Sequence, residues 1–157
     1  MPDKRPAAVH VDSLDVTKGS GYPAPFDEPC KERARRRLGD LFDLTDFGVN
    51  IVELPPGAWS SQRHWHSHED EFVYILSGTP TLITDAGETE LSAGMCAGFK
   101  AGDANGHQLV NTSAEPVTYL EMGSRNAEDD GHYPDIDLEC LKRAKGGQFT
   151  RKDGTPY

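Results

Sequence analysis

Side chains that can bind a metal ion are concentrated in residues 64–71 of this chain, which read His-Trp-His-Ser-His-Glu-Asp-Glu. Alternate side chains of an extended strand point to the same side, so His64 and His66 would share one face. Glu71 begins an apolar run, where a carboxylate is costly to bury unless it is paired or bound to a cation. A further histidine, His107, lies in a second glycine-rich segment. We predict that the two segments meet in space and hold one metal ion, which His64 and His66 could grip and to which His107 could supply a further ligand.

The remaining polar residues of the stretch have a simpler interpretation. We expect His68, Glu69 and Asp70 to lie in a solvent-facing loop, although His68 is two residues beyond His66 and could also be a ligand. The histidine pair alone could instead form a hydrogen-bonded pair in a core. Glu71 could act as an acid or base if it is not a ligand. Three residues near the cluster in sequence could contact the ligands or a substrate: Gln62, Arg63 and Lys100.

The elements that would position these side chains are mostly strands. Alternating or β-branched apolar segments, separated by Gly and Pro turns, indicate an all-β sandwich or barrel. The segments are 47–54, 60–66, 71–76, 81–84, 88–91, 95–99, 107–111 and 117–122.

The flanks of the strand-rich region have a different pattern. We predict a short helix over 29–38, with Pro29 in its first turn, and another over 137–145, ended by two glycines. The chain is then one domain with three parts: an N-terminal arm with a short helix (1–46), a β-barrel (47–123) and a C-terminal extension with a short helix (124–157).

Composition excludes several classes of function. The net charge is -10, which disfavours nucleic-acid binding because such proteins need a clustered basic face. The one dense basic run, residues 31–37, is interpreted as a solvated helix face, with docking of an anionic partner or substrate as a secondary alternative. No apolar run approaches the ~20 residues of a membrane span, and no secretory signal is visible. Three widely spaced cysteines favour a reducing cytoplasm.

Two motifs carry a resemblance to a known family. The first is Gly57, six residues, His64-Trp65-His66, four residues, Glu71, six residues and Gly78. The second is Gly94, five residues, Lys100-Ala101-Gly102, four residues, His107, three residues and Asn111. The chain thus resembles the cupin superfamily, and most closely its small bacterial single-domain members. It departs from the family pattern in two longer spacers and in Lys100, which replaces a proline.

The resemblance implies a jelly-roll (double-stranded β-helix) barrel, a homodimer, and His64, His66, Glu71 and His107 as metal ligands. Such a ligand set leaves an open coordination position and suits Zn, Mn, Fe, Ni or Co without choosing among them. We expect a metal-dependent enzyme that acts on a small polar molecule, of the dioxygenase, isomerase or lyase type. The alternative is a non-catalytic module that senses a sugar or a carboxylate. The sequence identifies no catalytic acid or base.

Overall fold

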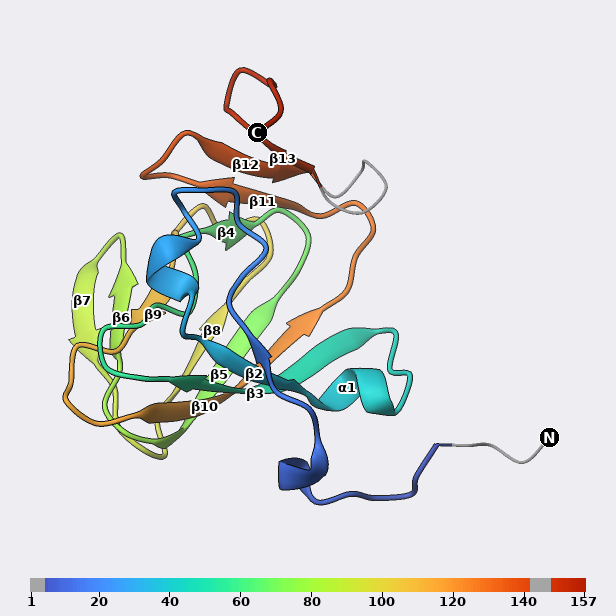
Figure 1. The fold of residues 1–157 in the computed structure, drawn as a ribbon. Coiled ribbons are helices and arrows are strands. Elements are labelled where there is room, and N and C mark those ends of the chain that lie inside the picture. Colours follow the sequence, from blue (N-terminus) through green and yellow to red (C-terminus); the bar gives the residue numbers. More distant parts are fainter. Residues whose placement is uncertain (1–4, 142–147) are drawn as a thin grey trace.

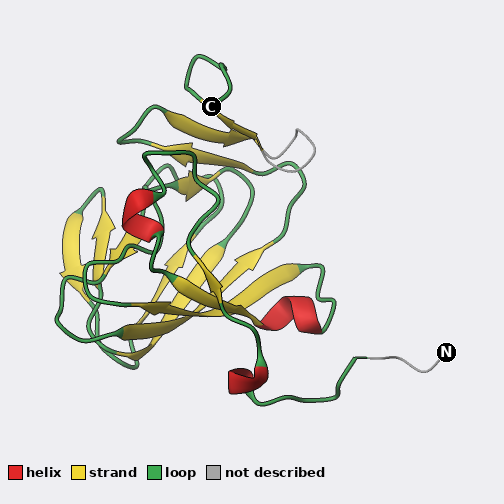
Figure 2. Ribbon diagram, in the orientation of Figure 1, coloured by secondary structure: helices red, strands yellow, loops and turns green. Residues whose placement is uncertain are grey.

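The computed structural model describes residues 5–141 and 148–157, and strands dominate that part of the chain (Figures 1 and 2). The helical elements are short: η1 (Val11–Ser13), η2 (Glu28–Cys30) and α1 (Leu38–Leu41). The strands are β1 (Thr17–Lys18), β2 (Ala34–Arg37), β3 (Phe47–Leu54), β4 (Trp65–His66), β5 (Glu71–Ser77), β6 (Thr81–Thr84), β7 (Gly87–Glu90), β8 (Cys96–Phe99), β9 (Gln108–Val110), β10 (Val117–Ser124), β11 (Asp130–Tyr133), β12 (Leu138–Leu141) and β13 (Gln148–Thr150).

The barrel is built from two antiparallel sheets. A six-stranded sheet has the order β1-β2-β3-β10-β5-β8, and a three-stranded sheet has the order β7-β6-β9. Figure 1 shows the smaller sheet standing beside one end of the larger one. Alternate residues of the long strands form the core between them, because each strand buries only one face. The core includes Val52, Leu54, Ile75, Leu109 and Tyr119. The all-β jelly-roll prediction is therefore confirmed.

A third sheet, of order β13-β12-β11-β4, covers one end of the barrel (Figure 1). It joins the C-terminal extension to the strand that carries His66, because β11 pairs with β4 and places Gly131 opposite His66. Tyr22 of the N-terminal arm packs against Tyr133 and Phe149 of the extension, with ring centroids 5.7 and 5.6 Å apart. Both flanks of the chain therefore meet at the end of the barrel where the histidines lie.

The helix predicted over 29–38 is wrong. The chain there forms the single turn η2, followed by β2, which pairs antiparallel with β3 and places Arg35 opposite Val52. Helix propensity is a weak preference, and an open sheet edge overrides it by offering a complete row of backbone hydrogen bonds.

The C-terminal helix prediction also fails where the structure tests it. Residues 138–141 form β12 between β11 and β13, and Leu138 is fully buried there. The reason is that both pairing partners of β12, namely β11 and β13, lie outside the segment, so its local pattern does not contain them. Residues 142–147 of the predicted helix lie outside the described residues.

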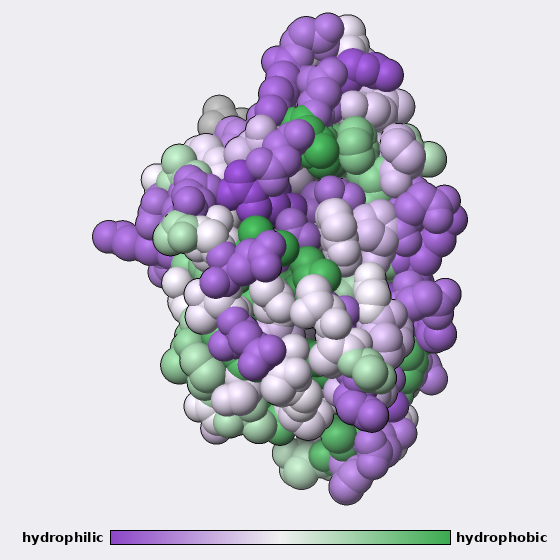
Figure 3. Space-filling view, turned by 90° about the vertical axis from the view of Figure 1, so that its left-hand side faces the viewer, coloured by the Kyte–Doolittle hydropathy of each residue, from purple (hydrophilic) through white to green (hydrophobic). Residues whose placement is uncertain are grey.

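The surface is mixed in character. Figure 3 shows hydrophilic and apolar side chains interspersed on the face that lies at the left of Figure 1. No helix in the described part of the chain has the length and apolar character that crossing a bilayer requires.

Candidate functional site

A pair of backbone hydrogen bonds brings the two histidine segments together. His64 donates its amide to the carbonyl of His107 at 3.1 Å, and His107 returns the bond at 2.8 Å. This isolated bridge places the two imidazoles side by side, with ring centroids 4.8 Å apart. The expected strand over 60–66 is regular only at β4, so the bridge, and not an extended ladder, sets the register of His64.

Three of the four predicted ligands surround a carboxylate oxygen of the fourth. Oε2 of Glu71 lies 2.7 Å from Nε2 of His107, 3.5 Å from Nε2 of His64 and 3.6 Å from Nε2 of His66. Donor atoms of His64, His66 and Glu71 all lie within 4.8 Å of one another, and His107 joins this group through its contact with Glu71. The structure thus brings together the four residues that the sequence grouped, while their role as ligands stays a prediction.

The outer nitrogens of two imidazoles are oriented by acceptors. Nδ1 of His64 lies 2.9 Å from the carbonyl oxygen of Gln62, and Nδ1 of His66 lies 2.7 Å from Oδ2 of Asp129. A carbonyl or carboxylate can only accept, so each Nδ1 carries a hydrogen, and each Nε2 is the ring nitrogen that faces Glu71. Three imidazoles and a carboxylate converging in this way form a donor set that fits a divalent cation.

Charges at the centre shift its pKa values in opposite directions. Burial raises the pKa of Glu71, but hydrogen bonds from His107 and His64 outweigh it and leave that pKa well below the usual range. For His66, burial lowers the pKa, while the bond to Asp129 and the charge of Glu71 outweigh burial and raise it. For His107, burial dominates and lowers the pKa. Glu71 is therefore ionised at neutral pH and supplies negative charge for a cation.

Asp129 is a residue of the site that sequence reasoning missed. It is fully buried, and its Oδ1 accepts the backbone amides of His68 and Glu69 at 2.9 and 3.1 Å. The sequence around it has the pattern of a polar loop. The acid comes close to the histidines only because β11 pairs with β4. A buried carboxylate with several donors is held rigidly and can fix the ring of His66.

The other candidates have different surroundings. His68 and Asp70 are exposed, as expected for a loop, whereas Glu69 is buried and accepts the amide of Asn126 at 2.8 Å. The prediction that Glu69 is solvated is therefore wrong.

The three residues expected near the ligands have separate partners. Gln62 donates to the carbonyl of Phe26. Arg63 pairs with Asp135 and Asp85, and Lys100 is exposed beside a small pocket of about 50 Å³ near the histidines.

A cavity of about 450 Å³ opens over the centre and is lined by residues of all three parts of the chain. The metal-binding cluster forms part of its wall. Another part is formed by Arg35 and Arg37, which alternate along β2, and by Arg33, which lies just before β2. The interpretation of residues 31–37 as a solvated helix face is therefore wrong, because a strand turns every second arginine inward. The alternation of arginines at 33, 35 and 37 is the signal that could have revealed it.

The arginines differ in how they are held. Arg33 donates to the backbone carbonyls of Gly19 and Ser60. Arg35 forms an ion pair through Nε with Oε1 of Glu121 at 3.1 Å, and its two terminal nitrogens have no partner among the described residues. Arg37 lies 3.6 Å from Asp40. Arg35 and Arg37 thus both keep donors for a ligand, and Arg35 is the more buried of the two, with 25% of its side chain exposed against 54% for Arg37.

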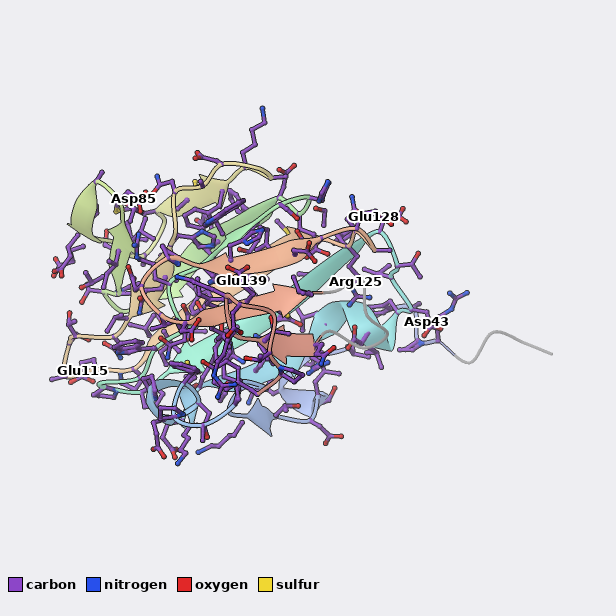
Figure 4. All side chains as sticks on the ribbon, turned by 90° about the horizontal axis from the view of Figure 1, so that it is seen from above. Asp43, Asp85, Glu115, Arg125, Glu128 and Glu139 are labelled. Atoms are coloured by element: carbon purple, nitrogen blue, oxygen red, sulfur yellow. The ribbon has the colours of Figure 1, made fainter. Side chains whose placement is uncertain are left out.

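Arg125 adds a fourth cation to the cavity wall, beside α1 (Figure 4). It donates to Asp40 at 2.7 Å and to the carbonyl of Leu44 at 2.8 Å. The cavity therefore has an imidazole–carboxylate end and a guanidinium-rich side.

Comparisons with a family model and with solved structures point to the same family. The family described as the cupin domain matches residues 50–123. A sugar phosphate isomerase from a cupin superfamily, from Silicibacter pomeroyi, is 43% identical, with 96% of each chain covered and a TM-score of 0.91. A putative sugar phosphate isomerase from Acidithiobacillus ferrooxidans is 25% identical over 90% of this chain and 89% of that chain, with a TM-score of 0.76.

A third match covers less of the molecule. A cupin protein from Bacteroides fragilis is 32% identical over 58% of this chain and 75% of that chain, with a TM-score of 0.52. No curated protein matches the chain significantly. The similarity to the first two structures extends over both flanks, beyond the residues that the family description covers.

Proposed function

The chain belongs to the cupin superfamily, and from that premise we propose that it is a metal-dependent isomerase of a phosphorylated sugar. The observation that carries the proposal is the shared cavity, in which an inward-facing row of arginines lies across from the histidine–glutamate centre. The similarity to a sugar phosphate isomerase over 96% of both chains supports the same reaction class.

His64, His66, Glu71 and His107 would hold the metal. A divalent ion bound there would supply a Lewis acid that polarises a carbonyl or hydroxyl oxygen of the sugar. The ligand types suit Zn, Mn, Fe, Ni and Co alike. Asp129 and the carbonyl of Gln62 orient two of the imidazoles, so the chain itself positions the donors before an ion arrives.

Arg35 would bind the phosphate group. A guanidinium matches phosphate oxygens with two parallel hydrogen bonds, and it keeps its charge at any physiological pH. Arg33, just before β2, and Arg37, at its end, line the same cavity and add positive potential. The cavity, about 450 Å³, falls within the usual 300–1,000 Å³ of small-molecule sites and suits a small phosphorylated substrate.

The test combines metal content with turnover. Protein purified without a chelating tag is analysed for metals beside His64→Ala and His107→Ala, and each is assayed on a panel of aldose and ketose phosphates. We expect metal in the wild type, loss of metal in both variants, and isomerisation that needs the metal. Full metal content in both variants would show that the ligand assignment is wrong.

The same assay separates the alternative, a non-catalytic module that binds a sugar or carboxylate. The sensor alternative predicts tight binding of a panel member, measured by calorimetry, with no turnover at any metal loading. That outcome would refute the isomerase proposal but would not contradict the proposed metal site.

A further inference from the structure

Glu121 is a carboxylate of the cavity wall that takes no part in the metal centre. We propose, on the premise of the isomerase function above, that Glu121 is the catalytic base that carries a proton between the two reacting carbons of the sugar phosphate. The inference rests on three observations. They are the position of Glu121 in the sheet, the contacts at only one of its carboxylate oxygens, and the absence of another acid with a free oxygen among the described residues of the cavity.

The strand register places Glu121 on the inner face beside the metal centre. In the pairing of β10 with β5, Gly123 lies opposite Glu71 and Glu121 lies opposite Val73. Glu121 is therefore the diagonal neighbour of Glu71, roughly 7–8 Å away by the spacing of antiparallel strands. Such a distance is enough for a substrate oxygen to reach the metal while an adjacent carbon reaches Glu121.

Two glycines leave room for the substrate at this point. Gly48 of β3 pairs with Gly123 of β10, and both line the cavity. Neither carries a side chain, so the inner face is open beside both Glu71 and Glu121. A Cβ on Gly123 would lie 3.6 Å from the Glu71 side chain and would take up part of this space.

Only one oxygen of the Glu121 carboxylate is occupied. Oε1 accepts a hydrogen bond from Nδ2 of Asn50 at 2.8 Å and pairs with Nε of Arg35 at 3.1 Å. Oε2 has no partner among the described residues. The side chain is 24% exposed, and it faces the cavity. A carboxylate that is anchored by one oxygen and free at the other is aimed at a ligand and has a lone pair to accept a proton.

The other acids of the cavity are engaged. Glu71 is surrounded by three imidazoles, and Glu69 is buried and accepts the amide of Asn126. Asp40 is bound by Arg125 and lies close to Arg37. The remaining hydroxyl groups that line the cavity belong to serines and tyrosines, which stay protonated at neutral pH. Glu121 is the remaining carboxylate with a free oxygen.

The proton transfer balances without a further reactant. Oε2 of Glu121 removes the proton from C2 of the open-chain aldose phosphate, and the electron pair of that C–H bond forms the C1–C2 double bond. The carbonyl pair moves to O1, which gains a proton from water and yields an enediol. The O2 proton then leaves, the C2 carbonyl forms, and the protonated Glu121 returns its proton to C1. C1 is reduced and C2 is oxidised, so no external oxidant is needed.

Arg35 links this base to the phosphate end of the cavity. Its Nε pairs with Glu121, while its terminal nitrogens remain for the phosphate. Binding of the phosphate would thus place the reacting carbons within reach of a base held by the same side chain.

The experiment compares the wild type with Glu121→Gln, Glu121→Asp and the control Glu53→Gln. Gln keeps the size of the side chain and an oxygen for Asn50 and Arg35, and Asp keeps the carboxylate. Glu53 lies on β3 and is exposed on the opposite face. Each protein is assayed on the sugar phosphate that the wild type isomerises, in D₂O, with deuterium in the product followed by NMR. Metal content and calorimetric binding of the corresponding sugar-alcohol phosphate are measured in parallel.

We expect Glu121→Gln to lose about 100-fold or more in kcat, in the range for a lost general base. It should also lose deuterium incorporation, yet keep its metal and bind the sugar-alcohol phosphate within threefold. Glu121→Asp should retain incorporation at a reduced rate, and Glu53→Gln should match the wild type.

Three results would overturn the role of Glu121. They are turnover of Glu121→Gln within threefold of the wild type, loss of metal or ligand binding in that variant, and wild-type isomerisation without deuterium incorporation, which indicates a hydride shift. Wild-type protein that isomerises no sugar phosphate would instead refute the proposed function on which the inference rests.

Discussion

The imidazole of His66 depends on a contact far outside the histidine motif. The bond from His66 to Asp129 crosses 63 residues of sequence, and Asp129 in turn is held by two backbone amides. Sequence spacing predicted which residues would meet but carried no information about the partner that sets the tautomer of His66. That partner is brought in by the pairing of β11 with β4.

Asp129→Asn tests this partner. Asn is a poorer acceptor for Nδ1–H of His66 and carries no charge, so we expect metal affinity to fall about 10–100-fold, as for other partners of ligating histidines. Affinity is measured by competition with a chelator. The control is Glu128→Gln, an exposed neighbour that lies in the loop before β11 (Figure 4). Equal affinity in the two variants would show that Asp129 does not orient the site.

Cysteine reactivity gives a prediction with a defined pH dependence. Cys30 is fully buried, and burial raises its pKa to about 11, while Cys96 is exposed. Alkylation needs the thiolate, so Cys30 has roughly 300-fold less of the reactive form than an ordinary thiol below pH 8. We expect iodoacetamide to label Cys96 first, and the labelling of Cys30 to rise with pH until pH 11. Mass spectrometry at pH 7, 8 and 9 checks the order, and equal labelling at pH 7 would contradict it.

At the scale of elements, β2 shows how one strand divides its residues between two roles. Arg35 lies opposite Val52 and faces the cavity, and the next residue, Arg36, lies opposite Ile51 and faces away. The same run of basic residues in a helix would spread around the axis and line no single wall. The change from helix to strand therefore converts a surface charge run into a candidate anion site.

Arg35→Gln and Arg36→Gln form a matched pair on this strand. A hydrogen bond to a charged group contributes about 1.5–3 kcal/mol, so Arg35→Gln should weaken sugar-phosphate binding by roughly 10-fold or more. Binding of the same sugar without phosphate should not change. Calorimetry on both ligands measures the difference. If Arg36→Gln weakens phosphate binding as much as Arg35→Gln, the effect is one of overall charge and the assigned role is wrong.

At the scale of the whole molecule, the flanks complete the site. The residues matched by the family description, 50–123, contain the four predicted ligands, but the arginines of β2 lie before them and Asp129 lies after them. Tyr22 and Tyr133 also line the cavity from opposite ends of the chain. The predicted division into 1–46, 47–123 and 124–157 within one domain stays a prediction that unfolding can test.

Leu138→Ala tests whether the C-terminal sheet unfolds with the barrel. Leu138 is fully buried in β12, so its truncation should lower the free energy of unfolding by about 2–5 kcal/mol. In one cooperative domain, fluorescence and circular dichroism should report the same shifted urea midpoint. The control is Leu76→Ala, at a side chain that is 45% exposed, with an expected change within about 0.5 kcal/mol. Two separate transitions, of which one is unshifted, would show that the extension folds independently.

The sequence by itself determined the all-β class and the grouping of His64, His66, Glu71 and His107, because strand alternation and local spacing are properties of neighbouring residues. Only the tertiary structure decided that Arg35 and Glu121 face the cavity, that Asp129 holds His66, and that residues 34–37 and 138–141 are strands. Each of these depends on a partner strand far away in the chain, which the local pattern alone does not identify.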